Sequence, residues 1–200
     1  MKAKIADASR SETAKIGQPK DSESEQWVAL FYSVVISPTR RIKSADLIKI
    51  AEHADFRRAR TVMSTGNLVG WARDDEAVVE QRLERAAEVI VGKRIPVLCR
   101  SVPNFRQILE RNPIQLESPS QAQEVAIRIM RSQPATDVLE RLASKVEKGD
   151  NFYLGDRALW LSSSNPLSKS RMMRAINASW VGVGTTRSLS SLLKIEKAIV

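Results

Sequence analysis

An apolar segment at residues 27–36 gives the first clear structural signal in the chain. It reads WVALFYSVVI, is rich in β-branched and aromatic residues, and is too short to span a membrane. We therefore predict a buried strand that ends at the turn-forming sequence Ser37-Pro38-Thr39. Ser44 suits a helix N-cap, and apolar residues then recur at helical spacing on one face as far as Ala54, which predicts a helix.

A polar turn separates the next two strand candidates, at residues 60–63 and 68–71. The turn reads Ser64-Thr65-Gly66-Asn67. Its Gly-Asn pair suits a hairpin with a positive backbone φ, because these residues adopt the left-handed region at low cost. The sequence therefore predicts a β-hairpin here.

A long helix and one more strand complete this half. Acidic residues at 74–76 complement the positive end of a helix dipole, and Gly92 suits the C-terminal end of that helix. Residues 95–99 read IPVLC, which is typical of a buried strand. Residues 27–99 thus give the order β-α-β-β-α-β, the split βαβ pattern of an antiparallel sheet covered by two helices.

The second half has the similar order β-α-β-β-α after a short leading helix at residues 103–111. The expected elements are a strand at 124–130, a helix from Thr136 to Gly149, a hairpin around Gly155-Asp156, and basic helices at 168–178 and 188–198. We predict an α+β fold of two split βαβ, ferredoxin-like subdomains, each an antiparallel sheet with helices packed on one face.

Three regions follow from these patterns. Residues 1–25 have almost no large apolar side chains, lack the apolar core of a secretory signal, and balance their basic with their acidic residues, so we expect a disordered tail. Residues 26–101 form the N-terminal subdomain and residues 102–200 the C-terminal subdomain.

Composition excludes several classes of site. The single cysteine, Cys99, excludes an internal disulfide framework and a multi-cysteine zinc site, and the single histidine, His53, disfavours a histidine-based metal site or a Ser-His triad. No Walker loop, GxGxxG or GxSxG motif is present. We therefore predict no catalytic residue, metal or cofactor. One cysteine and no apolar run of about 18 residues indicate a soluble cytoplasmic protein without a membrane span.

Net charge favours an anionic partner. The chain carries a formal charge of +9, and residues 38–60 and 167–200 are its most basic segments. Such clusters attract phosphate groups, which points to nucleic acid or a phosphorylated small molecule. Few aromatic residues lie among these charges, so an ordinary solvated basic surface is the alternative.

Six residues are candidates for binding such a ligand. In the polar turn, Ser64, Gly66 and Asn67 could present amides to an anion, or could serve the turn geometry alone. Arg100 follows a buried strand, where its guanidinium could bind a carboxylate or phosphate or could simply face solvent. Lys169 and Arg187 lie at the starts of the two basic helices and could converge on an anion. A catalytic Ser168-Lys169 pair would need a buried lysine.

The order of these motifs resembles the domain of unknown function 1697 family over roughly residues 26–195. Members carry a serine-glycine-asparagine turn, a proline-valine-leucine-x-arginine strand, a helix ending in asparagine-proline, and C-terminal serine-lysine and threonine-x-arginine-asparagine segments. The corresponding segments here are Ser64-Thr65-Gly66-Asn67, Pro96-Val97-Leu98-Cys99-Arg100, Asn112-Pro113, Ser168-Lys169 and Thr185-Thr186-Arg187-Ser188.

One departure from the family bears on function. Members follow the first strand with an arginine- and glycine-rich loop, whereas this chain reads YSVVISP at residues 32–38, and Ser188 replaces a family asparagine. The resemblance implies no established activity. Three hypotheses remain: a non-enzymatic binding protein for phosphate-rich ligands or nucleic acid, an enzyme on a small anionic metabolite, and a degenerate interaction scaffold.

Overall fold

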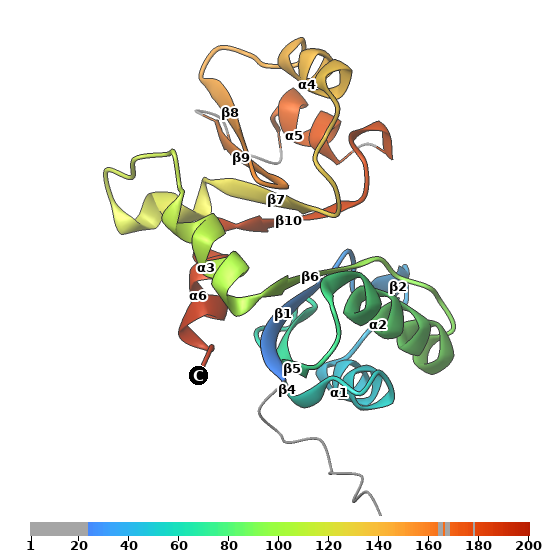
Figure 1. The fold of residues 1–200 in the computed structure, drawn as a ribbon. Coiled ribbons are helices and arrows are strands. Elements are labelled where there is room, and N and C mark those ends of the chain that lie inside the picture. Colours follow the sequence, from blue (N-terminus) through green and yellow to red (C-terminus); the bar gives the residue numbers. More distant parts are fainter. Residues whose placement is uncertain (1–23, 164–165, 167–168, 178) are drawn as a thin grey trace, which may run out of the picture.

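The computed structural model describes residues 24–163, 166, 169–177 and 179–200. The predicted tail therefore lies outside the described residues, apart from Ser24 and Glu25, and Glu25 already begins the first strand. Two four-stranded antiparallel sheets form the two halves of the molecule, one below the other in Figure 1.

The first sheet has the strand order β4-β5-β1-β6. Its strands and the elements between them are β1 (Glu25–Phe31), β2 (Val35–Ser37), β3 (Arg40–Arg41), α1 (Ser44–His53), β4 (Arg57–Thr61), β5 (Asn67–Ala72), α2 (Glu76–Val91) and β6 (Val97–Ser101). All strand pairs are antiparallel, and α1 and α2 pack on one face. Strand β1 is central, so both of its faces are buried and its sequence is continuously apolar rather than alternating.

The predicted strand at residues 27–36 is shorter than expected. Strand β1 ends at Phe31, because its neighbour β5 begins opposite Leu30, at Asn67. The Tyr32 amide still donates to the Pro96 carbonyl at 2.8 Å, and the chain then leaves the sheet to form the small β2–β3 hairpin. The end of the partner strand, which the apolar pattern cannot show, therefore sets the end of β1.

The second sheet has the order β10-β7-β9-β8. Its elements are α3 (Val102–Glu110), η2 (Pro119–Gln123), β7 (Ala126–Met130), α4 (Thr136–Ala143), β8 (Asp150–Gly155), β9 (Ala158–Ser163), α5 (Arg171–Ile176), η3 (Ser179–Val181), β10 (Gly184–Ser188) and α6 (Leu189–Lys197). Numbered within each half, both sheets have the order 4-1-3-2, which is that of a split βαβ unit. The α+β prediction with two such units is confirmed.

Three apolar clusters form the core. One lies between the first sheet and α1 and α2, and another between the second sheet and α4 and α5. The third is shared: Val28 and Leu30 of the first sheet pack with Ile127 and Ile129 of the second, and α3 and α6 complete it. Each sheet therefore has its own helix pair on one face, and the opposite faces bury each other with α3 and α6 (Figure 1).

Gly66 fixes the turn between β4 and β5. Its φ is +80°, and a Cβ there would lie 2.7 Å from Val34 Cγ1 and 3.1 Å from Phe31 Cβ. The predicted positive φ at this glycine is confirmed. Asn67 is not part of that conformation, since it is the first residue of β5.

Candidate binding cavity

A cavity of about 430 Å³ lies where the two halves meet, between α3 and the β8–β9 hairpin. We call it the α3–hairpin cavity. Its lining residues are Arg100, Asn104, Gln107, Ile108, Arg111, Pro113, Phe152, Tyr153, Leu154, Gly155, Asp156, Arg157, Ala158 and Trp160. This volume is within the range of small-molecule sites in proteins.

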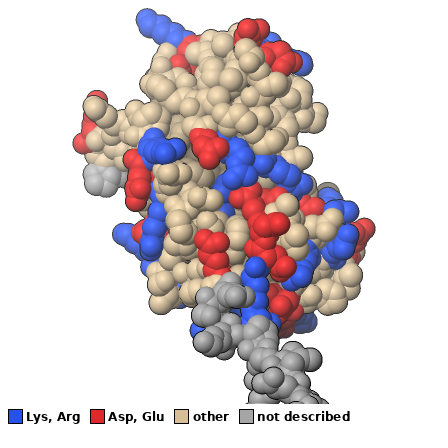
Figure 2. Space-filling view, in the orientation of Figure 1, with Lys and Arg blue, Asp and Glu red and all other residues tan. Residues whose placement is uncertain are grey.

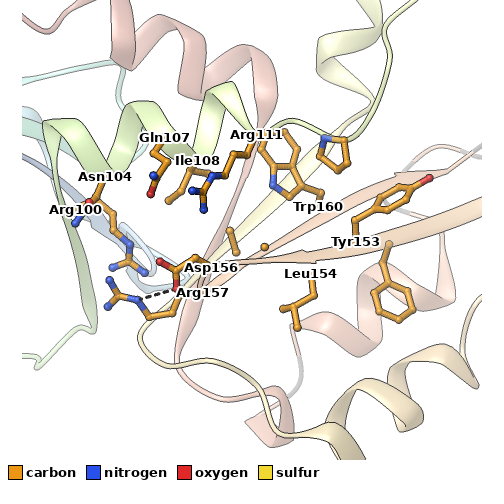
Figure 3. Close-up of a pocket in the computed structure, with 14 residues that line it drawn as sticks. Arg100, Asn104, Gln107, Ile108, Arg111, Tyr153, Leu154, Asp156, Arg157 and Trp160 are labelled. Atoms are coloured by element: carbon orange, nitrogen blue, oxygen red, sulfur yellow. Dashed lines mark ion pairs between the residues drawn. The ribbon is translucent and has the colours of Figure 1, made fainter.

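One side of the cavity is aromatic and aliphatic. Tyr153 of β8 pairs directly with Trp160 of β9, so both side chains lie on the same face of the hairpin. Tyr153 and Leu154 are 44% and 38% exposed, although both are large apolar side chains. Figure 3 shows these three residues on the side of the cavity opposite Arg100. This wall could contact the face of a flat ring.

The other side is polar and cationic. Helix α3 contributes Asn104, Gln107 and Ile108, and its C-cap residue Arg111 follows at a spacing of seven from Asn104, which places all four on one face. Arg100, at the end of β6, and Arg157, in the hairpin turn, complete this side (Figure 3). Three guanidinium groups thus come from three separate parts of the chain, which no local sequence motif would reveal.

Two carboxylates partly balance these arginines, since Glu76 pairs with Arg100 and Arg157 and Asp156 lies 3.9 Å from Arg157. Glu76 Oε1 accepts a hydrogen bond from Arg100 at 3.0 Å and from Arg157, and Glu76 Oε2 accepts a second bond from Arg157 at 3.2 Å. Burial lowers the pKa of Arg100, while the Glu76 hydrogen bond raises the pKa of Arg157. Arg111 is exposed and has no ion pair among the described residues. The cavity therefore has more cationic than anionic groups.

Arg100 was predicted as a binding residue, and it lines this cavity. Its side chain is only 2% exposed, so the alternative of a solvent-facing strand end is wrong. It also donates to the carbonyls of Cys99 at 2.6 Å and of Met130. The second of these bonds joins β6 to β7, so Arg100 connects the two sheets as well.

Asn67 and Arg187 come together, but in a different place. Arg187 Nε donates to Asn67 Oδ1 at 2.9 Å, and its terminal nitrogens donate to the Phe31 and Thr65 carbonyls, to Thr185 Oγ1 and to the Thr186 carbonyl. We call this set the arginine clasp. All five N–H groups of Arg187 are used on neutral oxygens, so the clasp has no free donor for a ligand.

Burial without a carboxylate lowers the pKa of Arg187 to about 10, so the group stays protonated at neutral pH. The Asn67 amide nitrogen is also fully used, on the Val62 carbonyl at 3.0 Å and Thr65 Oγ1 at 2.9 Å. Asn67 is completely buried. The clasp therefore joins the β4–β5 turn to β10, 120 residues later, and its contacts are internal to the protein.

The remaining predicted residues do not join either group. Ser64 is exposed on the turn. Gly66 contributes its carbonyl to the Phe31 amide at 2.8 Å and permits close packing. Lys169 is exposed, its amide donates to the Pro166 carbonyl, and its carbonyl accepts from Arg174 beside α5. Ser168 lies outside the described residues, and the exposed position of Lys169 does not provide the buried lysine that a Ser-Lys pair requires.

Sequence reasoning missed three acidic residues that the fold covers. Glu76, Glu80 and Glu84 repeat at intervals of four on one face of α2, and we call them the glutamate row. Glu80 and Glu84 are only 4% and 6% exposed, so they are not ordinary helix-surface acids. Their regular spacing is the signal that was present in the sequence.

The glutamate row covers the outer edge of β6. Glu80 Oε1 accepts from the Cys99 amide at 2.9 Å, and Glu84 Oε1 accepts from the Val97 amide at 3.3 Å. Arg131, from just beyond β7, donates to Glu80 at 2.7 Å, to Glu84, and to the Val97 carbonyl at 3.0 Å. Backbone groups that an edge strand would leave unpaired are thus satisfied by side chains.

The predicted basic surface is interrupted by acids. On the face shown in Figure 2, Lys and Arg side chains alternate with Asp and Glu over the half that contains the first sheet. On the edge strand β4, Arg57 pairs with Asp55 at 2.9 Å, and Arg60 donates to the Ala198 carbonyl. Charged side chains on an edge strand also protect it from pairing with other chains.

Metal-binding and membrane-spanning features are both absent from the described part of the chain. It contains no cluster of three or more His, Cys, Asp or Glu side chains placed to bind a metal ion. None of its helices has both the length and the apolar character needed to cross a membrane.

Comparisons with known proteins place the chain in a family. A solved structure of a conserved bacterial protein from Streptococcus pneumoniae superposes with a TM-score of 0.66 at 14% identity, covering 87% of this chain and 98% of that chain. At this identity the likeness shows the fold alone. The comparison with curated proteins gave no match. The model of the family described as protein of unknown function (DUF1697) matches residues 25–160, and the chain therefore belongs to that family.

Proposed function

We propose that this protein is a non-enzymatic binding protein for a small phosphorylated molecule that carries a flat ring, bound in the α3–hairpin cavity. The observation behind the proposal is that Arg100, Arg111 and Arg157 line the same cavity as the Tyr153 and Trp160 side chains. Guanidinium groups bind phosphate oxygens in pairs, and aromatic side chains contact ring faces.

The charge balance supports a phosphate in particular. Glu76 accepts hydrogen bonds from both Arg100 and Arg157, and Asp156 lies 3.9 Å from Arg157, so two carboxylates face three guanidinium groups. Arg111 adds a third guanidinium on the opposite side of the cavity from Leu154. A phosphate group at neutral pH carries more than one negative charge and could balance the positive charge of the arginines that the carboxylates leave uncompensated.

The lining favours binding over catalysis. Among the described residues of this cavity there is no serine, cysteine, histidine or lysine, and its one carboxylate, Asp156, is exposed beside Arg157 rather than paired with a nucleophile. Arginine stays protonated and cannot act as a general base. Cys99 is near but completely buried, and burial raises the pKa of its thiol well above the ordinary value. A thiol of this kind also suits the reducing cytoplasm that we propose as the location.

Isothermal titration with mononucleotides, sugar phosphates and inorganic phosphate tests the proposal. We expect mononucleotides to bind more tightly than inorganic phosphate, because only they reach the aromatic wall. Arg111→Gln should weaken binding about tenfold or more, since a charge-assisted hydrogen bond contributes about 1.5–3 kcal/mol.

Arg85→Gln is the matched control. Arg85 is exposed on α2 and outside the cavity lining, and its replacement removes the same charge. Equal losses in both variants would mean that binding depends on overall charge, which would overturn the proposal. Preferred binding of single-stranded oligonucleotides, unaffected by Arg111→Gln, would favour a nucleic-acid surface instead.

A further inference from the structure

A second pocket, of about 410 Å³, lies at the other end of β6 from Arg100. It is lined by Tyr32, Pro96, Arg128, Asn177, Ser179, Gly182, Val183 and Gly184, and we call it the Arg128 pocket. Pro96 directly precedes β6, whereas Arg100 is near its end, so the two pockets are separate. Residues from both halves of the chain form it.

Arg128 differs in its hydrogen-bond partners from the other arginines between the two sheets. It lies on the central strand β7, is 2% exposed, and makes no carboxylate ion pair among the described residues. Its terminal nitrogens donate to Asn177 Oδ1 at 3.2 Å and to the Gly182 carbonyl at 2.8 Å. Each terminal nitrogen therefore has one further N–H, and Nε has no partner.

Gly184 explains how the guanidinium is positioned. A Cβ at Gly184 would lie 3.0 Å from Arg128 Nε and 2.7 Å from the Ile129 carbonyl. Nε is therefore covered by the Gly184 backbone, and a ligand could approach only the two terminal nitrogens. Two parallel N–H groups at the end of a guanidinium match the two oxygens of a carboxylate.

The other arginines show the contrast. Arg131 and Arg157 pair with the glutamate row, and Arg187 uses all five of its N–H groups in the arginine clasp. Arg128 has neither a carboxylate nor a full set of acceptors. A buried cation in this condition favours an anion from outside the chain.

We infer that the Arg128 pocket binds a small organic carboxylate with an apolar body. Arg128 is the one charged residue in the described lining, so a single negative charge suits the pocket better than a phosphate. Tyr32 and Val183 are 47% and 41% exposed, and together with Pro96 they offer an apolar surface beside the guanidinium. Burial lowers the pKa of Arg128 and nearby Tyr32 opposes that shift, but the group remains cationic.

Benzoate, acetate and inorganic phosphate are suitable probes, followed by amide NMR shifts on the full chain. We expect saturable shifts with benzoate at Tyr32 and at residues 182–184, weaker shifts with acetate, and none with phosphate. Tyr32→Ala, at an exposed site, should weaken benzoate binding about tenfold if the ring contact contributes about 1.4 kcal/mol. Tyr153→Ala, in the other cavity, is the matched control and should leave benzoate binding unchanged.

Arg128→Met should abolish benzoate binding, because it removes the guanidinium and keeps a side chain of similar volume, and the amide spectrum reports whether the variant is folded. Unchanged benzoate shifts in a folded Arg128→Met protein would overturn the inference, as would phosphate binding in preference to benzoate. Arg111→Gln separates this site from the α3–hairpin cavity, because it should weaken mononucleotide binding and leave benzoate binding as it is.

Discussion

The arginine clasp and the glutamate row join the same two halves of the molecule by different means. In the clasp, Arg187 is buried with five hydrogen bonds to neutral oxygens and no carboxylate. Along the row, Arg131 is held by Glu80 and Glu84, and it is 38% exposed. An arginine at this junction can thus be stabilised by full hydrogen bonding or by charge pairing. In the α3–hairpin cavity Arg100 and Arg157 share Glu76, whereas Arg111 makes no ion pair among the described residues, which is why Arg111 is the arginine that best tests ligand binding.

Removing the clasp should have the largest effect. Arg187→Ala removes the guanidinium donors from the Phe31 and Thr65 carbonyls and from Asn67 Oδ1 at the junction. We expect a loss of about 3–5 kcal/mol in the free energy of unfolding, because several buried acceptors lose their donor at once. Urea denaturation measures this. Arg187→Lys retains the charge but has only three donors, so its unfolding free energy should lie between those of the parent protein and Arg187→Ala. A loss below about 1 kcal/mol for Arg187→Ala would contradict the structural role of Arg187.

Gly66→Ala should cause the next largest loss of stability. Its methyl group would lie 2.7 Å from Val34 Cγ1, and the φ of +80° is unfavourable for alanine. We expect a loss of about 2–3 kcal/mol, measured by thermal unfolding. Gly92→Ala is the control: the φ there is +77°, but no atom lies within 4 Å, so only the backbone cost of about 1 kcal/mol should appear. Equal losses at both sites would mean that the packing of Gly66 is unimportant.

Glu80→Gln tests the charge pairing in the row. Glutamine keeps an oxygen for the Cys99 amide, so the loss at pH 7 should be less than about 1 kcal/mol. Burial raises the pKa of Glu80 above its ordinary value of 4.5. Above pH 4.5 the folded protein therefore holds a proton that the unfolded chain has released. This stabilisation is complete below pH 4.5 and is lost as the pH rises through the folded-state pKa.

Glutamine cannot ionise, so Glu80→Gln lacks this pH dependence. The margin by which the unfolding free energy of the parent protein exceeds that of Glu80→Gln should therefore be larger near pH 4 than at pH 7. Urea unfolding across that range measures the margin. A margin that grows with increasing pH would show that ionised Glu80 stabilises the fold, which is the opposite of the dependence expected from a raised pKa.

Arg111→Gln should have the smallest effect on stability. Arg111 is exposed at the end of α3 and makes no ion pair among the residues described, so we expect a change within about 0.5 kcal/mol. Chemical denaturation gives the value. A larger loss would place Arg111 with the structural arginines and weaken its assignment to a ligand.

Much of the fold could be predicted from residue patterns. The acidic residues at 74–76 and Gly92 indicated the two ends of α2, and the turn around Gly66 indicated the β4–β5 hairpin. Less of the site could be predicted. Arg100, one of the candidate residues, lines a cavity, whereas Asn67 and Arg187 contact each other.

The sequence by itself determined most of the elements, their order and the glycine at position 66, because local periodicity and backbone conformation depend on nearby residues. Strand β10 and the β2–β3 hairpin were not predicted, because their short sequences lack a clear apolar pattern. Only the tertiary structure decided which polar side chains are buried. Glu80 lies on the polar face of an amphipathic helix and is buried because β6 and Arg131 cover it. Arg187 contacts Asn67, which lies 120 residues earlier in the sequence, and Tyr153 lines the same cavity as residues of α3. Periodicity specifies that a face is covered, but the partner that covers it depends on how the two sheets pack.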